Sequence, residues 1–164
     1  QDRIWLDAYH REFYRQRSGL RESSLTAWAR LHRPYPGLEP VLRRLAGRWT
    51  LRIATAKDRV SVRALLEHYG LGDLFPDGAV LDKETGRTKR FHLEAIHRQL
   101  GVPFADITFV DDKVNHLERV AGLGVRPVLA GWGHNTPREH DRARALGFAI
   151  ATLDRIEETL EVDG

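Results

Sequence analysis

The feature that most constrains the fold is a regular alternation of helical and strand patterns after Pro34-Tyr35-Pro36-Gly37. Helices are predicted at residues 38–46, 62–69, 93–100, 114–121, from 136 onward, and 153–160, with strands at 49–55, 78–81, 107–111, 126–130 and 148–151. Strands that alternate with helices of about ten residues predict a parallel sheet with helices on both faces.

The chain before this alternation is helical in pattern. Apolar residues recur at helical spacing over residues 4–17 and again over 25–32, and Ser18-Gly19 is expected to separate the two helices. We therefore predict a helical lobe at residues 1–33, followed by an α/β core at 34–164.

Composition excludes several classes of protein. The chain has 164 residues, enough for one cored domain or for one domain with a small lobe. It has no cysteine, no bilayer-length apolar run and no signal-peptide pattern, which is compatible with a cytoplasmic protein. The net charge is only +3 and the arginines are dispersed, so nucleic-acid binding is not favoured. The sequence begins at Gln1 and contains no methionine, so we expect it not to be a complete open reading frame.

An acidic pair ends the strand expected at residues 107–111. Asp111 and Asp112 follow Ile107-Thr108-Phe109-Val110, a run typical of a buried parallel strand. Adjacent carboxylates repel each other, and a hard cation such as Mg²⁺ suits an all-oxygen cluster of this kind. The alternative is that the two acids form a turn or a helix cap.

Two further residues are expected near the same edge of the sheet. Thr55 ends a strand and, with the backbone of Ala56, precedes a helix, where free N–H groups can bind an anion. Lys89 follows a polar loop and could place a point charge on a phosphate. Singly, they are also explained as a helix-entry threonine and a solvated lysine. Together with the acidic pair they supply what a phosphate with Mg²⁺ needs.

The order of these motifs resembles that of the haloacid dehalogenase superfamily of phosphohydrolases. The likeness covers roughly Pro34 to the end of the chain, and the lobe before it looks like the tail of the family's inserted cap. The passages that carry it are Pro34-Tyr35-Pro36-Gly37-Leu38, Leu51-Arg52-Ile53-Ala54-Thr55, Lys89 ahead of Gly101-Val102, Phe109-Val110-Asp111-Asp112, and the phosphoglycolate-phosphatase-like Val128-Leu129-Ala130-Gly131-Trp132-Gly133. This resemblance implies a three-layer α/β/α Rossmann-like fold with a partial helical cap.

The resemblance also implies roles for individual residues. Thr55, with Ala56, would bind the phosphoryl oxygens, and Lys89 would neutralise charge on the phosphoryl group and on the nucleophile. Asp112 would be a Mg²⁺ ligand, with Asp111 as the second candidate. The sequence departs from the family at two positions. His116 stands where many members have a second acid or amide, and Lys113 replaces a frequent small residue.

The family's first motif, a strand ending in Asp-x-Asp whose first Asp attacks phosphorus, is absent. The nearest candidate is Asp7 after Ile4-Trp5-Leu6, but the acid position is Tyr9 and the spacing fits a helix better. We expect the sequence to begin downstream of the nucleophile, or a second chain to supply it. Without this central strand the chain is expected to be inactive alone. It is also expected to be marginally stable, to join its flanking strands directly, or to borrow a strand.

The function expected from the resemblance is Mg²⁺-dependent hydrolysis of a small phosphorylated metabolite. A non-catalytic phosphate-binding or scaffold domain with the same fold is the main alternative. A receiver-type phosphoacceptor domain would place its acidic pair first, whereas here Thr55 and Lys89 precede it. Dehalogenase chemistry is a further alternative, but it needs no Mg²⁺ and leaves the acidic pair unexplained. The sequence does not identify the substrate.

Overall fold

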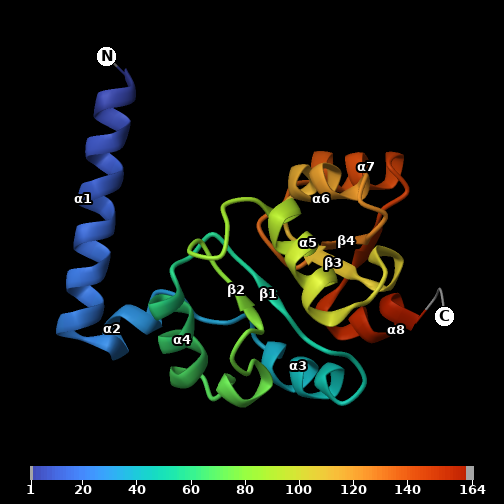
Figure 1. The fold of residues 1–164 in the computed structure, drawn as a ribbon, viewed down its shortest axis with the longest axis horizontal. Helices are drawn as coiled ribbons and strands as arrows, with labels where there is room; N and C mark the ends of the chain where they lie inside the picture. The colour runs from blue at the N-terminus through green and yellow to red at the C-terminus, as the bar shows by residue number, and fades with distance from the viewer. Residues whose placement is uncertain (1, 162–164) are drawn as a thin grey trace.

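The computed structural model describes residues 2–161, without the side chains of residues 2–4, 7 and 10 (Figure 1). The α-helices are α1 Asp2–Ser23, α2 Leu25–Arg30, α3 Leu38–Ala46, α4 Arg59–His68, α5 Lys89–Leu100, α6 Val114–Ala121, α7 Pro137–Ala145 and α8 Ile156–Glu161. The strands are β1 Ile53–Ala54, β2 Val80–Leu81, β3 Thr108–Asp111, β4 Arg126–Ala130 and β5 Ala149–Ala151. Short 3₁₀ helices lie at Gly72–Leu74, Phe104–Asp106 and Leu153–Arg155.

The strands are all parallel, and they form two sheets where the sequence analysis expected one. One sheet pairs β1 with β2, and the other has the order β3-β4-β5. Helices and parallel strands thus give the predicted α/β Rossmann-like class. Of the three outcomes expected without a central strand, direct joining is wrong, because β1 and β3 do not pair in the part of the chain that the structure describes.

Each sheet packs against its own group of helices. The larger core lies around β3 and β4, where Leu117 of α6 and Leu129 of β4 are fully buried. A second apolar cluster joins α4 to the β1–β2 sheet, with Val62, Leu66 and Val80 at its centre. Leu81 of β2 nevertheless belongs to the larger core, and α3 packs in a third cluster with β4 and β5, so the two halves of the α/β core also share buried contacts.

The predicted strand at residues 49–55 is shorter in the structure. Only Ile53 and Ala54 form β1, although Leu51 still packs against two buried clusters. A strand requires a neighbour to accept and donate its backbone hydrogen bonds. Because β1 is paired along one edge only, the residues before it remain irregular. The other predicted strands and helices differ from the observed elements mainly at their ends.

The lobe contains one long helix and one short helix. The predicted break at Ser18-Gly19 is wrong, because α1 continues to Ser23. A glycine costs a helix about 1 kcal/mol but does not end it. The break falls instead at Ser24, whose hydroxyl caps α2 by accepting a hydrogen bond from the N–H of Ala27.

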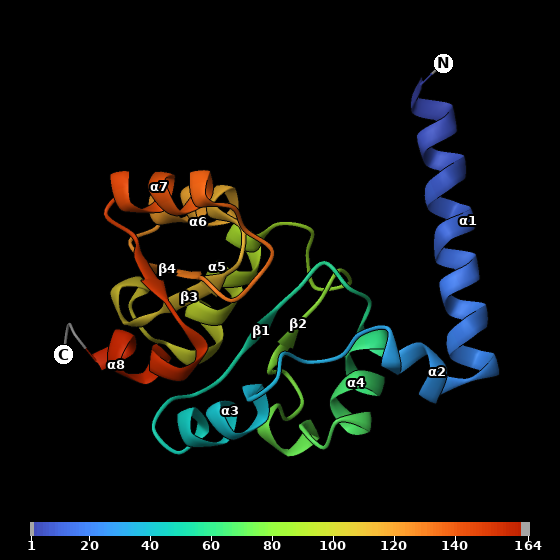
Figure 2. The ribbon, with the colours of Figure 1, turned by 180° about the vertical axis from the view of Figure 1, so that it is seen from behind.

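In both ribbon views α1 projects away from the α/β core (Figures 1 and 2). It carries exposed aromatic side chains, including Trp5, Tyr9 and Phe13. Despite its 22 residues, neither α1 nor any other helix of the described chain is long and apolar enough to cross a membrane.

Several contacts attach the lobe to the core. Trp28 of α2 is almost completely buried, and the hydroxyl of Tyr69 donates to the carbonyl of Ala29. At the end of α1, Arg21 donates to the Ser61 hydroxyl and lies 3.2 Å from the Asp58 carboxylate. Asp58 in turn caps α4, so the lobe is fixed to the helix that follows Thr55.

Replacing Gly19 by alanine should stabilise α1 by about 1 kcal/mol, because the new methyl group meets no atom within 4 Å and alanine is the better helix former. Gly70→Ala is the control. It adds the same methyl group in open space, but at φ +66°, and should destabilise by about 1–2 kcal/mol. Urea unfolding followed by circular dichroism measures both effects. Destabilisation by Gly19→Ala would show that the helix does break there.

Candidate functional site

Lys89 lies between the two sheets. It is the first residue of α5, which begins after the Thr88 N-cap. Its ammonium group donates a 2.5 Å hydrogen bond to the carbonyl of Ala54 at the end of β1. The same nitrogen lies 3.4 Å from a carboxylate oxygen of Asp111 at the end of β3. One side chain therefore connects the carboxyl ends of both sheets.

Asp111 is held from several directions. Its Oδ1 accepts a hydrogen bond from the N–H of Lys113 at 2.9 Å and lies 3.0 Å from Nδ1 of His116, while Oδ2 faces Lys89. The carboxylate side chain is only 9% exposed. His116, which departs from the family pattern, thus contacts the acidic pair directly. Lys113 instead reaches the backbone carbonyl of His134.

Asp112 faces the loop after β4. Its Oδ2 accepts a hydrogen bond from the N–H of His134 at 2.9 Å, and its carbonyl accepts from the Asn135 side chain. Gly133 packs directly against it, since a Cβ at that position would lie 2.2 Å from the Asp112 Cβ. Only a residue without a side chain fits between this loop and the acidic pair.

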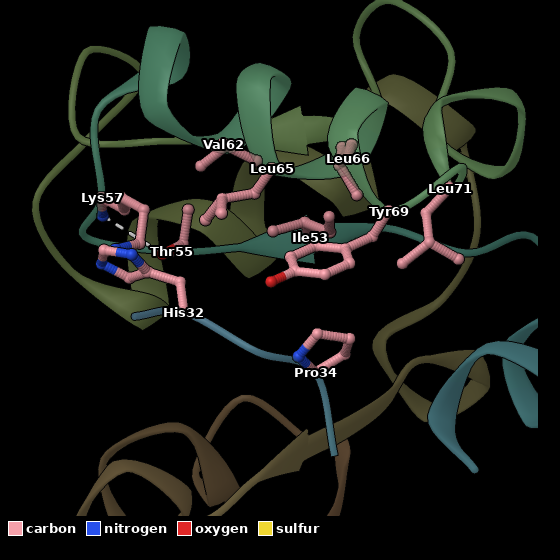
Figure 3. A pocket seen from close by; sticks show the side chains of 10 residues that line it. All are labelled: His32, Pro34, Ile53, Thr55, Lys57, Val62, Leu65, Leu66, Tyr69 and Leu71. Atoms are coloured by element: carbon pink, nitrogen blue, oxygen red, sulfur yellow. Dashed lines mark hydrogen bonds between the residues drawn. The ribbon is translucent and has the colours of Figure 1, made fainter. Parts of the chain in front are cut away.

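Thr55 and Ala56 follow β1. The Thr55 hydroxyl accepts a hydrogen bond from the N–H of Lys57 at 3.1 Å and lines a cavity with His32 (Figure 3). Ala56 is exposed. Among the described residues, neither Thr55 nor Asp112 hydrogen-bonds to Lys89. The structure thus brings Lys89 into contact with Asp111. Thr55 and Asp112 are the residues that directly follow the two partners of Lys89, which are Ala54 and Asp111.

Asp82 is a buried acid that the sequence analysis did not single out. It follows β2 and is 0% exposed, and its carboxylate accepts hydrogen bonds from Arg59 at 2.5 Å and from the N–H and hydroxyl of Thr85. Burial would raise the pKa of Asp82, but these hydrogen bonds outweigh it and hold the pKa at about 2. Asp82 orders the loop that leads to Lys89. Its position at the end of a strand was the signal available in the sequence.

The described residues contain no group of three or more His, Asp or Glu side chains that could hold a metal ion. Asp111 and Asp112 nevertheless offer hard oxygen ligands. Mg²⁺ in phosphoryl-transfer sites is commonly bound by one or two carboxylates, with water and phosphate oxygens completing the octahedron. The pair therefore fits Mg²⁺. The side chain of Asp7 lies outside the described residues.

A large cavity separates the two sheets. Its volume is about 770 Å³, and residues of β1, β3, α3 and α5 line it, among them Ala54, Thr108 and Val110. The N–H groups of Ile53 and Thr55 bond to the segment containing β2, so the backbone groups of Ala54 point the other way, toward the cavity. Just before β3, the carbonyl of Ile107 accepts a hydrogen bond from the N–H of Arg126 in β4, so the backbone groups of Thr108 and Val110 face the cavity.

A lysine and paired acids at the carboxyl ends of parallel strands are the groups that α/β proteins use to bind phosphate and its metal ion. The model of one family, described as haloacid dehalogenase-like hydrolase, matches residues 3–123. This chain belongs to that family, whose members are hydrolases. The match includes the helical lobe and ends before the glycine loop at 131–133. No individual curated protein matches the chain.

Replacing Gly133 by alanine should displace Asp112, because the new methyl group overlaps its Cβ. We expect a loss of about 1–3 kcal/mol in stability, measured by urea unfolding. Gly122→Ala is the matched control, since its added Cβ meets nothing within 4 Å and its φ is −66°. Equal effects of the two substitutions would contradict the packing argument.

The low pKa of Asp82 predicts a loss of stability in acid. A carboxylate with a pKa near 3.9 when unfolded and about 2 when folded stabilises the protein above pH 5, and this contribution disappears as pH falls toward 2. The contribution is about 2 kcal/mol. Asp82→Asn should destabilise at pH 7 and flatten the unfolding free energy between pH 5 and 2. Asp77→Asn, at an exposed carboxylate, is the control and should destabilise far less at pH 7.

Proposed function

We propose that this protein hydrolyses a small phosphorylated metabolite in a Mg²⁺-dependent reaction. The observation that carries the proposal is the position of Lys89, whose ammonium lies between the Ala54 carbonyl and the Asp111 carboxylate. A cation at the shared end of two parallel sheets is where a phosphoryl group would be neutralised. Family membership supports hydrolysis.

The roles follow from the surroundings of each residue. Thr55, with the backbone of exposed Ala56, would bind phosphoryl oxygens at the entrance to α4. Lys89 would neutralise charge on the phosphoryl group and the nucleophile, leaving its present bond to Ala54. Asp112 and Asp111 would hold Mg²⁺, which when bound supplies charge neutralisation at the phosphate.

The attacking carboxylate is proposed to come from polypeptide outside these 164 residues. The support is the 770 Å³ cavity between the two sheets, which the described chain leaves open. Its walls include two parallel strand edges with inward-facing backbone groups, which are what an added strand requires. A parallel strand placed there would end beside Lys89 and Asp111.

This arrangement explains why the chain is expected to be inactive alone. Thr55, Lys89 and the acidic pair can bind a phosphate, but no covalent phosphoryl intermediate forms without a nucleophile. With the strand in place, its aspartate would attack phosphorus and release the alcohol, and water would then release inorganic phosphate. The added strand would also satisfy the backbone groups of Ala54, Thr108 and Val110.

A non-catalytic phosphate-binding or scaffold domain is the second candidate. The observation that favours it is the environment of Asp111, where Lys89, His116 and the N–H of Lys113 already engage both carboxylate oxygens. Such a carboxylate needs no metal to balance its charge. This candidate predicts phosphate binding without turnover.

The test measures phosphate release from para-nitrophenyl phosphate with Mg²⁺. The 164-residue chain alone should be inactive. Addition of a peptide with five alternating apolar residues followed by aspartate should produce activity that EDTA removes, while the same peptide ending in asparagine should not. In the active mixture Asp112→Asn should abolish turnover, whereas Asp141→Asn, at an exposed acid on α7, should not.

Two results would reject parts of this proposal. Turnover by the chain alone would show that an internal residue acts as nucleophile. Binding of the aspartate peptide and of phosphate without any turnover would favour the scaffold candidate.

A further inference from the structure

A stripe of exposed side chains follows one face of α1. It consists of Leu6, Tyr9, Phe13, Gln16 and Leu20, which recur at alternating intervals of three and four residues. This is the spacing of positions a and d in the heptad of a coiled coil. The four apolar residues among them are 37–65% exposed, and Gln16 is exposed as well. We call these five residues the α1 seam.

The α1 seam is turned away from the contacts that hold α1 in place. Arg21 reaches Asp58 and Ser61 of the core, and the Lys83 ammonium lies 5.4 Å from the centre of the Tyr14 ring. Tyr14 and Arg21 each follow a seam residue by one position, which is about 100° around the helix. Both ribbon views show α1 reaching beyond the rest of the molecule (Figures 1 and 2).

The exposed area is large enough to mark an interaction surface. Trp5, beside the seam, is 76% exposed, and the Tyr9 and Phe13 rings are stacked with their centres 6.2 Å apart. Aromatic side chains cover about 150–250 Å² each, so with the two leucines the patch reaches several hundred Å². Two copies of it give an area of the order of 1,000 Å², at the low end of specific interfaces.

The residues beside the seam carry complementary charges. Glu12 occupies heptad position g and Arg17 occupies position e. In a parallel pair of helices, position g of one helix lies beside the position e that is five residues further along the other. Glu12 of each copy would therefore meet Arg17 of the other. An antiparallel pair sets g against g and e against e, and neither Glu12 nor Arg17 would meet an opposite charge there.

Both charged side chains are close to where such a pair requires them. The Arg17 guanidinium lies 5.9 Å from the centre of the Phe13 ring, next to the seam. Glu12 pairs with Arg15 of its own helix, but both side chains are more than half exposed, so exchanging this contact costs little. At the seam itself, the Gln16 amides of two copies can donate to and accept from each other, which would fix the register.

A lipid surface fits this helix less well than a second copy does. Helices that lie on anionic membranes carry a polar face rich in lysine and arginine. The polar residues of α1 are instead nearly balanced, with five arginines and four acids between Asp2 and Ser23. Balanced charges at heptad flanks are typical of helices that pair with other helices.

We propose that two copies of this chain associate through the α1 seam as a parallel two-stranded coiled coil, with Glu12 of each copy paired with Arg17 of the other. The two-fold axis would run along the seam, and the two α/β cores would lie on opposite outer sides. Because the seam spans only residues 6–20, we expect a dissociation constant of the order of 10 µM. This inference does not depend on the proposed hydrolase function.

Sedimentation equilibrium of the 164-residue chain between about 1 and about 300 µM tests the association. The average mass should rise with concentration from that of a monomer toward that of a dimer. Phe13→Glu sets two carboxylates opposite each other at the seam and should weaken the association at least about tenfold. Leu31→Glu is the matched control, since Leu31 is 71% exposed but lies at the end of α2, outside the seam, and it should change nothing.

Charge exchange tests the parallel arrangement. Glu12→Arg alone and Arg17→Glu alone each place like charges beside the seam, and each should weaken self-association about tenfold. An equimolar mixture of the two variants restores both opposite-charge pairs and should associate as the unchanged chain does. Leu6→Glu, near the start of α1 and away from the core, is a second seam variant, and circular dichroism at about 1 µM checks that α1 remains helical in each.

Four results would overturn the proposal. A monomer throughout the concentration range would assign the seam to a different polypeptide. Unchanged association of both Phe13→Glu and Leu6→Glu would place the dimer contact elsewhere on the molecule. A mixture of the two charge variants that associates no better than either alone would exclude the parallel pairing. Binding to phosphatidylglycerol vesicles that Phe13→Glu abolishes, with no dimer in solution, would assign the seam to a lipid surface.

Discussion

The polar contact that joins the carboxyl ends of the two sheets is the bridge from Lys89. No strand of the described chain connects β1 to β3, yet the Lys89 ammonium reaches the Ala54 carbonyl on one side and the Asp111 carboxylate on the other. A charged hydrogen bond of this kind is stronger than a neutral one, and at a partly buried position water screens it little. The same side chain is the one proposed to neutralise the phosphoryl group, so it serves both the structure and the proposed chemistry.

Much of the core was predictable because its signals are local. The capping box at Thr136 and Glu139 fixes the start of α7, and Gly101 at φ +66° ends α5, as the sequence patterns indicated. Lys89 and Asp111 meet because the polar ends of parallel strands and their loops share one edge of a fold, a rule that needs no coordinates. The family membership of the chain agrees with those patterns.

The parts that could not be predicted depend on tertiary contacts. Nothing local indicates that Asp112 turns toward the His134 N–H, or that Asp82 is buried beneath Arg59. The length of β1 depends on whether a neighbour pairs with its second edge, and residues 49–52 alone cannot reveal this. The Ser18-Gly19 pair predicted a helix break, but the surrounding residues favour continuation of α1 to Ser23.

The division of the sheet has a consequence for cooperativity. The β1–β2 half has an apolar cluster of its own with α4, while Leu81 of β2 and Ala54 of β1 link it to the cluster around β3 and β4. The α4 cluster can therefore open before the β3–β4–β5 half, with native-state hydrogen exchange at different free energies. Filling the space between them would couple the two halves through shared backbone hydrogen bonds. The protein would then unfold in a single transition. Slow amide hydrogen exchange would be found at Ile53 and Ala54 as well as in β3 and β4.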